Sequence, residues 1–206
     1  NLQANRDILD VLNTQLIVAG SNIIYLRLKF LRELQKIAKE KHLKIAEKED
    51  FFMEYNSSVI DTLGFDAEIP YSVEDIAFVF DEKLKSRQDE EIIRAQAVVG
   101  PHRDDVFYYI NGIDSRKFAS QGQQRTIVLS LKLAELELIK EKIGDTPVLL
   151  LDDVLAELDN LRQNYLLNAI GNETQTIITS VDTVLFGDDY LKNVEVFNIS
   201  GGEVSF

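Results

Sequence analysis

The apolar residues in the first part of the chain follow a spacing that a long helix satisfies. They recur every three or four positions, close to a heptad repeat, at Leu9, Leu12, Leu16, Ala19, Ile23, Leu26, Phe30, Leu34 and Ile37. A continuous apolar stripe on one face of a helix needs a covering element, because water would otherwise contact the whole stripe. The sequence therefore predicts a long arm helix with a packing partner.

A second helical segment follows a short region of strand and loops. Residues 51–72 favour a strand with loops, and residues 73–97 favour a helix that packs against the first. Ser72 and Asp75 have the spacing of a capping box, although the short Asp side chain serves this motif less well than Glu or Gln. We assign residues 1–97 to a helical arm domain with long antiparallel helices.

Charge is distributed unevenly along this arm. The chain has 35 acidic and 22 basic residues and a net charge of −13, the wrong sign for simple adhesion to nucleic acid. Residues 27–44 nevertheless carry seven Lys or Arg against two Glu. A local basic patch can hold phosphates, since salt screens charges beyond about 8–10 Å. Lys36, Lys39 and Lys41 are candidates for DNA contact, and a solvated helix face is the alternative.

Composition excludes several classes of protein. Cysteine is absent from the 206 residues, so disulfides and thiolate metal sites are excluded. No run of about eighteen apolar residues and no signal-peptide pattern is visible. We expect a globular chain of one or two domains, located in the cytoplasm and without a membrane partner.

After residue 97 the pattern changes from helical to mixed. Asn111-Gly112 lies between β-rich runs, which is the strongest short signal for a hairpin. Helical and β-rich segments then alternate, and two β-rich runs flank Gly201-Gly202 at the end. Residues 98–206 therefore predict an α/β domain. Its expected elements are a helix over 121–142, an apolar strand over 147–151, a helix near 160–170 and a strand over 174–180.

Two carboxylates follow the apolar strand. Val148–Leu151 can form a buried parallel strand, whose end presents Asp152 and Asp153 at the carboxyl edge of the sheet, where α/β proteins bind ligands. Such a pair suits Mg²⁺-nucleotide chemistry, because one carboxylate can hold the metal while the other orients and deprotonates an attacking water. The alternative is a strand that ends in two turn-forming acids.

The stretch FASQGQQRT, residues 118–126, begins the long helix. Ser120 stands at the N-cap position, and Gly122 leaves room for a phosphate near the first turn, where the helix dipole favours negative charge. This helix start therefore suits an anion. An ordinary N-cap followed by a tolerated glycine is the alternative.

The order of these motifs resembles an ABC-type ATPase head. Ala119–Gln123 is similar to the signature motif, with Gln121 where a second glycine is usual, Val148–Asp153 to the Walker B strand, and Ala156–Asp159 to the D-loop. With the upstream stretch VVGPHRDDVFYYING, the motifs resemble the RecF family of recombination mediators along essentially the whole chain. The resemblance implies an α/β fold that is part of an ABC-type head, an incomplete P-loop NTPase sheet with a helical arm.

The resemblance also implies how such a head would work. Ser120, Gly122 and Gln123 would contact the γ-phosphate of an ATP held by a second subunit, so that ATP joins two heads into a homodimer. The complete protein would be a slow DNA-dependent ATPase that binds DNA at gaps or single-strand–double-strand junctions. Its partners would be RecR and RecO, and it would help to load RecA during repair and the SOS response.

Further roles come from the same resemblance. Asp152 would serve Mg²⁺, Asp153 would stand in for the usual catalytic Glu, and Asp159 would cross the dimer interface. The family's switch histidine has no match, because Ser180 stands about where it would lie. The identity of the γ-phosphate sensor is therefore open.

The stretch PHRDD permits two interpretations. As structure, residues 101–105 would form a turn with an internal Arg–Asp ion pair. By the resemblance, His102 and Arg103 would lie near the nucleotide or the DNA path. Arg125, one turn into the long helix, is either an interfacial phosphate contact or a surface charge.

The sequence lacks the Gly-Lys pair of a P-loop, because none of its ten glycines precedes a lysine. We therefore expect the carboxyl portion of a longer protein, which alone would bind ATP poorly and hydrolyse none. Two other functions stay open. An SMC-type structural head would need very long coiled coils, whereas this arm is short; a non-catalytic interaction module would suit the acidic surface.

Overall fold

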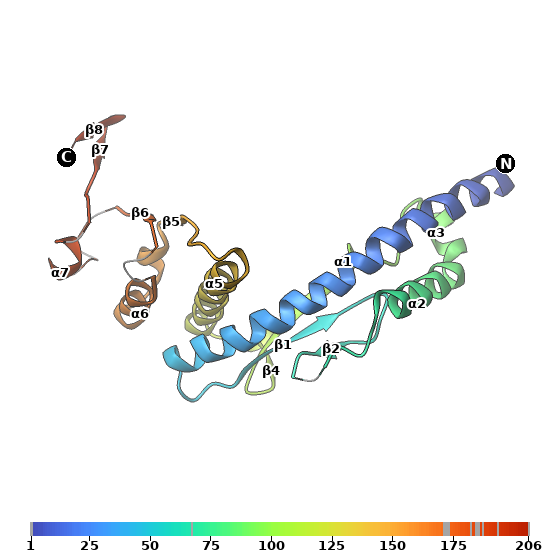
Figure 1. Cartoon of the computed structure of the whole chain (residues 1–206), viewed down its shortest axis with the longest axis horizontal. Helices are drawn as coiled ribbons and strands as arrows, with labels where there is room; N and C mark the ends of the chain where they lie inside the picture. The colour runs from blue at the N-terminus through green and yellow to red at the C-terminus, as the bar shows by residue number, and fades with distance from the viewer. Residues whose placement is uncertain are drawn as a thin grey trace. The chain divides into compact units, whose positions relative to one another are not determined.

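The computed structural model consists of two compact units, Asn1–Asp145 and Thr146–Phe206, each of which is described by itself (Figure 1). The predicted boundary at residue 97 lies inside the first unit, and a division of function there stays a prediction. The described residues are 2–66, 68–170, 174–181, 183, 186, 188–192 and 194–205.

The first unit is organised around α1, a helix of 44 residues from Leu2 to Ile45. The predicted arm helix is confirmed, but the predicted seam matches its buried face only in part. Among the seam residues Leu34 is buried and Leu16 and Ile37 pack against the core, whereas Leu12, Ile23, Leu26 and Phe30 are exposed. The other residues that α1 buries, also at three- and four-residue spacing, are Ile24, Leu28, Leu31, Gln35, Ala38, His42 and Ile45. Periodicity alone was misleading because α1 carries apolar residues on two faces.

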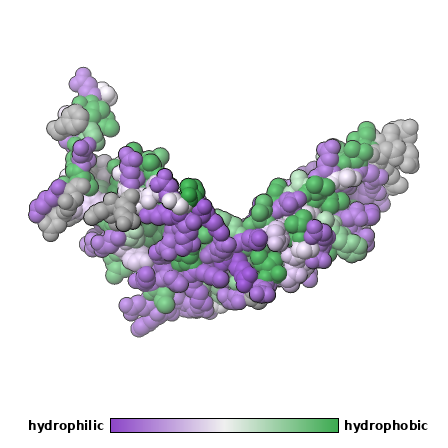
Figure 2. All heavy atoms as spheres, in the orientation of Figure 1, coloured by the Kyte–Doolittle hydropathy of each residue, from purple (hydrophilic) through white to green (hydrophobic). Residues whose placement is uncertain are grey.

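The exposed stripe has a second consequence. Figure 2 shows apolar side chains (green) at the surface along this helix. Among the described residues, α1 over Ile8–Ile45 is long and apolar enough to cross a membrane by length and composition, which the sequence analysis did not expect. Only 17% of its most apolar window is buried, and one such helix is weak evidence for a membrane span. The second half of α1 packs into the core of its unit.

The strand β1, Phe51–Asn56, and the helix α2, Val73–Ser86, pack against α1. Side chains of β1 alternate between buried and half-buried, as expected for a strand with one covered face. The approach of α2 to α1 is close at Gly20, where an added Cβ would lie 2.6 Å from Cε1 of Phe80. A larger residue at position 20 would therefore displace the buried Phe80 ring.

The sheet of the first unit has the order β2-β1-β3-β4. The strand β3, Asp105–Ile110, is antiparallel to β1 along its whole length, with Phe51 opposite Ile110. The predicted hairpin is confirmed: Asn111 and Gly112, with φ of 51° and 78°, connect β3 to β4 as a turn with positive φ at both positions requires. The short strands are β2, Leu63–Gly64, and β4, Ile113–Asp114.

The helix predicted over 73–97 is two helices. After α2, the chain turns at Arg87 and continues as α3, Gln88–Arg94. The capping box is complete, since Ser72 N donates to Asp75 Oδ2 over 2.9 Å and Asp75 N donates to Ser72 Oγ over 3.1 Å. The short Asp side chain therefore reaches as Glu would.

A short helix α4, Ser115–Phe118, leads into α5, Gln121–Ile143, which ends at Gly144 in the left-handed conformation. The helix α5 packs on α1, with Ile127, Ala134 and Leu138 in the shared core. Ion pairs also join the two helices, between Lys41 and Glu137 and between Lys142 and Glu33. The start of α5 is thereby held beside the carboxyl end of the arm helix.

The second unit contains the parallel pair β5, Leu149–Asp152, and β6, Thr176–Thr179, joined through α6, Asn160–Ile170. In this pair Asp152 lies opposite Thr179. The predicted strand–helix–strand order is confirmed, but the strand expected to be buried alternates between half-buried and exposed residues. The two β-rich runs around Gly201-Gly202 pair as an antiparallel hairpin. The remaining elements are the 3₁₀ helix η1, Val154–Glu157, the helix α7, Asp188–Leu191, and the strands β7, Asn198–Ser200, and β8, Glu203–Ser205.

Candidate nucleotide-binding residues

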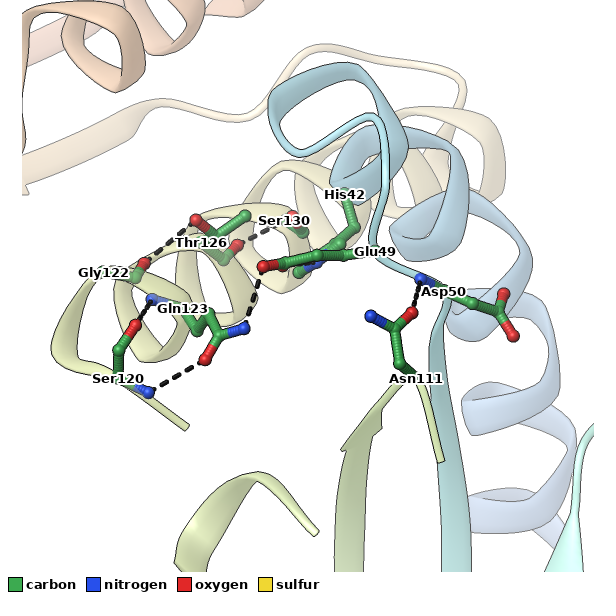
Figure 3. A network of polar contacts seen from close by, with 9 residues as sticks. All are labelled: His42, Glu49, Asp50, Asn111, Ser120, Gly122, Gln123, Thr126 and Ser130. Carbon is green, nitrogen blue, oxygen red and sulfur yellow. Dashed lines mark hydrogen bonds and ion pairs between the residues drawn. The ribbon is translucent and has the colours of Figure 1, made fainter. Parts of the chain in front are cut away.

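The start of α5 is fixed by a reciprocal cap. Ser120 Oγ accepts a hydrogen bond from Gln123 N over 3.2 Å, and Gln123 Oε1 accepts one from Ser120 N over 2.9 Å (Figure 3). This capping box satisfies two backbone donors that a helix start would otherwise leave unpaired. Ser120 is therefore the N-cap that the sequence predicts.

The cap leaves donors that an anion could use. Gln124 N donates to Ser120 O over 3.0 Å, so the cap and the helix account for two first-turn donors. The N–H groups of Gln121 and Gly122 come before those of Gln123 and Gln124, and an α-helix has no internal acceptor for its first N–H groups. The Ser120 hydroxyl accepts in the cap and keeps its own hydrogen for donation. An exposed serine with adjacent N–H groups at a helix dipole's positive end can hold a phosphate oxygen.

Gln123 also connects the helix start to the end of the arm helix. Its Nε2 donates to Glu49 Oε1 over 2.9 Å, while its Oε1 is used in the cap. Glu49 Oε2 in turn lies 2.9 Å from Nε2 of His42, whose side chain is fully buried and stacked on Phe51. The Gln123 side chain is half-buried and uses its oxygen and its nitrogen for contacts within the protein; its contact with a nucleotide stays a prediction.

The contacts of Glu49 and His42 were not predicted from the sequence. Gln123 lies 74 positions from Glu49 along the chain, and charge patterning had assigned the end of α1 to a basic surface. The spacing of Ser120 and Gln123 is itself a capping-box signal, so a Gln that points back into the protein could have been predicted. Its partner could not, because that contact depends on how α5 packs on α1.

The two carboxylates at the end of β5 are organised by one threonine on β6. Thr179 Oγ1 donates to Asp152 Oδ1 over 2.6 Å and accepts from Asp153 N over 3.0 Å. Asp152 and Asp153 are both exposed. The structure thus brings the predicted pair together at the carboxyl end of a parallel strand, where ligands bind in α/β folds.

Asp153 has an unusual backbone conformation. Its φ of 50° and ψ of 20° are left-handed, and its side chain makes no capping bond to η1, which it precedes. Asp tolerates this region better than most residues but still adopts it at a cost. The strand β5 therefore ends at Asp152, and Asp153 connects it to η1.

The chemistry of this pair fits Mg²⁺ in its usual nucleotide-bound form. Only Oδ1 of Asp152 is engaged by Thr179, which leaves Oδ2 for a metal or its water shell. Among the described residues, no three His, Asp or Glu gather as a metal cluster. A nucleotide-bound Mg²⁺ commonly takes one or two carboxylates and completes its shell with water and phosphate oxygens, so two carboxylates are sufficient.

Asp159 caps the next helix. Its Oδ1 accepts from Arg162 N over 3.0 Å, and its Oδ2 pairs with the Arg162 side chain. The backbone hydrogen bond from Arg162 is the main cause that lowers the pKa of Asp159. The buried Gln163 donates to the carbonyl groups of Leu155 and Leu158 over 2.8 and 3.0 Å, which closes the preceding turn. Gln163 was not predicted.

In the PHRDD stretch, Asp104 is a structural residue. Its Oδ1 accepts from Ser58 N and Ser58 Oγ, over 2.7 and 2.9 Å, and its Oδ2 accepts from Ser57 Oγ and from the hydroxyl of Tyr55. Burial and this bond raise the pKa of Tyr55. Arg27 completes the cluster by donating to Tyr55 and to the carbonyl of Pro101.

The predicted turn is present, but its internal ion pair is not the one that forms. Arg103 donates to the Ala97 carbonyl over 3.0 Å, and Asp105 pairs with Arg116 over 2.7 Å. His102 Nε2 lies 3.2 Å from the same Ala97 carbonyl. His102 and Arg103 are exposed, because Asp104 turns inward to satisfy Ser58 and Tyr55.

The arm lysines differ from one another. Lys39 pairs with Asp50 over 2.8 Å, and this hydrogen bond raises the pKa of Lys39. Lys41 pairs with Glu137, with its side chain mostly covered. Lys36 is exposed. A phosphate would therefore have to displace carboxylates from two of these three lysines.

Of the other candidates, Arg125 is exposed on the first turns of α5, and Ser180 is half-buried, one residue beyond Thr179. Ser180 is thus at the same strand-end edge as Asp152 and Asp153. The helix-start residues belong to the first unit and the carboxylates to the second, and each set is described by itself.

Comparison with solved structures defines the class. Two structures of the recombination mediator protein RecF in the RecFOR pathway match this chain, RecF-ATP over 97% of it with a TM-score of 0.80 and RecF-ATPrS over 96% with a TM-score of 0.78, both at 32% identity. The chain covers 51% and 50% of those structures. It is therefore part of an ABC-type ATPase fold, with small and partial sheets.

Curated relatives narrow the class to one family. The DNA replication and repair protein RecF of Trichodesmium erythraeum (strain IMS101) is 44% identical over 194 residues, and that of Bacillus subtilis (strain 168) is 38% identical over 201 residues. These matches cover 94% and 97% of the chain, which spans about half the length of the curated relatives it matches. No family model matches the chain. By these similarities the chain belongs to the RecF family.

Proposed function

We propose that this chain supplies the signature helix and the Walker B carboxylates of a DNA replication and repair ATPase of RecF type. The observation that carries the proposal is the helix start at Ser120, which is capped, exposed and able to donate from its hydroxyl and from adjacent N–H groups. Such a helix start can bind, through these donors, the γ-phosphate of an ATP that a second subunit holds. The two subunits would then associate only while ATP is present.

The carboxylates would act at the nucleotide held on their own subunit. Asp152, oriented by Thr179, would hold Mg²⁺ through Oδ2 or a bound water. The metal would neutralise charge on the phosphates. Asp153, whose side chain is not used as a cap, would orient the attacking water and take its proton. The donors at Ser120 and Gly122 of the other subunit would stabilise charge that develops on the γ-phosphoryl oxygens.

The role in DNA repair rests on the family. The relatives are named DNA replication and repair protein RecF, and the matching structures are described in the RecFOR pathway. We propose that the complete protein binds gapped or junction DNA in the cytoplasm, works with RecR and RecO, and helps to load RecA. Asp159, His102, Arg103, Arg125 and Ser180 are proposed contacts at the dimer interface, the nucleotide or the DNA.

The proposal is tested by ATP-dependent association. The chain would be joined to the P-loop segment of a RecF relative, and its mass in solution measured by sedimentation with and without ATP and Mg²⁺. We expect a dimer with ATP and a monomer without it, and loss of the dimer in Ser120→Arg, where the large side chain blocks the phosphate. Arg125→Ala separates an interfacial phosphate contact from a surface charge, because only the former would weaken the dimer. A dimer that forms equally without ATP would contradict the proposal.

DNA binding by the arm is tested through salt. Each phosphate contact contributes to the slope of log affinity against log salt. Lys36→Glu should lower that slope and weaken binding, because Lys36 is exposed and pairs with no carboxylate in the part of the chain that the structure describes. Lys39→Glu and Lys41→Glu should add less, since Asp50 and Glu137 compete for these lysines. Lys132→Glu on α5, whose lysine pairs with Glu135, is the matched control. Equal slopes for Lys36→Glu and Lys132→Glu would dismiss the arm as the contact.

A further inference from the structure

A chain of hydrogen-bonded side chains, buried at His42 and exposed at Ser120, links the arm helix to the start of the signature helix. It runs from His42 near the end of α1, through Glu49 in the following loop, to Gln123 and Ser120 at the start of α5 (Figure 3). All of its contacts lie between 2.9 and 3.2 Å. From this geometry we infer that Glu49 is a positioning residue, which sets Ser120 for its contact with a phosphate. The inference rests on the proposed function of Ser120.

Glu49 is itself held in place. Its Oε2 is bound by Nε2 of His42, a ring that is fully buried and stacked on Phe51 with a centroid distance of 5.1 Å. Nδ1 of His42 is buried without a hydrogen-bond partner. The tautomer with its proton on Nε2 donates to Glu49 and leaves only an acceptor unpaired at Nδ1, which costs less than a buried unpaired N–H. Glu49 therefore has one preferred orientation.

Gln123 transmits this orientation to the cap. An amide side chain has one acceptor oxygen and one donor nitrogen group, and here they point to opposite partners, Ser120 N and Glu49 Oε1. Without Glu49, the Gln123 side chain would be free to rotate into solvent, and the Ser120 backbone would lose its acceptor. Two hydrogen bonds of the helix start thus depend on one carboxylate outside the helix.

The consequence concerns the arm. The carboxylate that holds the Gln123 side chain is anchored on α1 through His42, so a displacement of the end of α1 would move Glu49 and release the Gln123 half of the cap. The position of the arm helix would then determine whether Ser120 is held in the orientation that contacts a phosphate. A cap that depended only on Ser120 and Gln123 would be insensitive to α1.

Two variants and a control test this inference. Glu49→Ala removes the acceptor, whereas Glu49→Gln keeps an oxygen that can accept from Gln123 Nε2. Glu33→Ala is the control, because Glu33 also joins α1 to α5, through Lys142 over 2.7 Å, but at the far end of α5. The first readout is amide hydrogen exchange over residues 118–126 in this chain. The second is ATP-dependent association of the chain joined to a P-loop segment.

We expect exchange in the first turn to rise about fivefold in Glu49→Ala and to return toward the parent value in Glu49→Gln, with no change in Glu33→Ala. ATP-dependent association should weaken in the same order. Unchanged hydrogen exchange in Glu49→Ala would overturn the inference. It would also be overturned if Glu49→Ala exchanged faster but associated normally with ATP, while Ser120→Arg lost ATP-dependent association. If Ser120→Arg leaves association intact, the proposed function fails, and the inference fails with it. In that case a change in hydrogen exchange would report only on the stability of the helix cap.

Discussion

Thr179 and Asp152 lie opposite each other on neighbouring parallel strands, and the threonine hydroxyl donates to the carboxylate over 2.6 Å. The same oxygen accepts from the backbone of Asp153 over 3.0 Å. One side chain on β6 therefore orients both acids at the end of β5. This explains how a two-stranded piece of sheet can present a defined carboxylate pair.

Removal of the Thr179 hydroxyl should weaken the use of Mg²⁺ in ATP turnover more than it lowers the stability of the fold. In Thr179→Val the shape is kept, Asp152 loses its donor and the backbone of Asp153 its acceptor. We expect the Mg²⁺ concentration for half-maximal ATP turnover, in the chain joined to a P-loop segment, to rise about tenfold. Thr179→Ser retains the hydroxyl and should keep the parent value. Equal Mg²⁺ dependence in Val and Ser variants would show that the contact is incidental.

The left-handed backbone at Asp153 predicts opposite effects on stability and turnover. Asp153→Gly should stabilise the chain, by about 0.5–1 kcal/mol relative to Asp153→Ala, because glycine adopts a φ of 50° without strain. Both variants should lack ATP turnover, since the proposed base is absent. Urea unfolding gives the stability difference. An alanine variant as stable as the glycine variant would mean that this conformation is not kept in solution.

Asp104 and Arg103 are adjacent residues whose replacement should affect stability very differently. Asp104→Ala leaves Ser58 and the buried Tyr55 hydroxyl without their acceptor, which should cost about 2–3 kcal/mol of unfolding free energy. Arg103→Ala removes an exposed side chain and should stay within about 0.5 kcal/mol. Thermal or urea unfolding distinguishes them. If Arg103→Ala proved the more destabilising, the assignment of Asp104 as the structural member of PHRDD would be wrong.

Leu26 and Leu28 test which face of α1 is covered. Leu28 is fully buried, whereas Leu26 is 63% exposed. Leu28→Ala should therefore cost about 2–5 kcal/mol, and Leu26→Ala should stay within about 0.5 kcal/mol. Urea unfolding of the isolated chain is the measurement. Similar losses at both positions would mean that a partner or a second copy covers the predicted seam in solution.

The cap at Asp159 predicts a dependence on pH. Hydrogen bonds from Arg162 lower the pKa of Asp159 in the folded state, so its contribution is present at pH values above the pKa of an unfolded Asp, about 4. It is lost as the pH falls through the lower folded value. Asp159→Asn should therefore lower the melting temperature at pH 7 and have a smaller effect near pH 3. An equal difference at both pH values would exclude the carboxylate charge as the cause.

Local signals predicted much of the fold. Asn111-Gly112, the capping spacing of Ser72 with Asp75, and Ser120 at the start of α5 were all read correctly, because each depends on residues close in sequence. The strand order was not predicted, since the pairing of Phe51 with Ile110 is a long-range contact. The buried face of α1 was predicted only in part, because two faces of the helix carry apolar residues.

In the candidate site, too, features that depend on neighbouring residues were predicted and features that depend on packing were not. The positions of Asp152 and Asp153 at the end of a strand followed from the sequence pattern. The hydroxyl that orients them did not, because Thr179 is one of several threonines in a β-rich run and only the parallel register selects it. The role of Glu49 was not predicted because its contact with Gln123 joins residues 74 positions apart in the sequence. The roles of polar residues that support a site depend on packing, which sequence patterns describe poorly.

The central claim is that Ser120 completes a nucleotide site on another subunit. The most direct test is the ATPase rate of the chain joined to a P-loop segment, measured over a range of protein concentrations and repeated with Ser120→Arg. The account predicts a rate per molecule that rises with concentration and disappears in the variant, because the site forms only between two subunits. A rate per molecule that is independent of concentration and unaffected by Ser120→Arg would reduce this helix start to an ordinary cap and contradict the account.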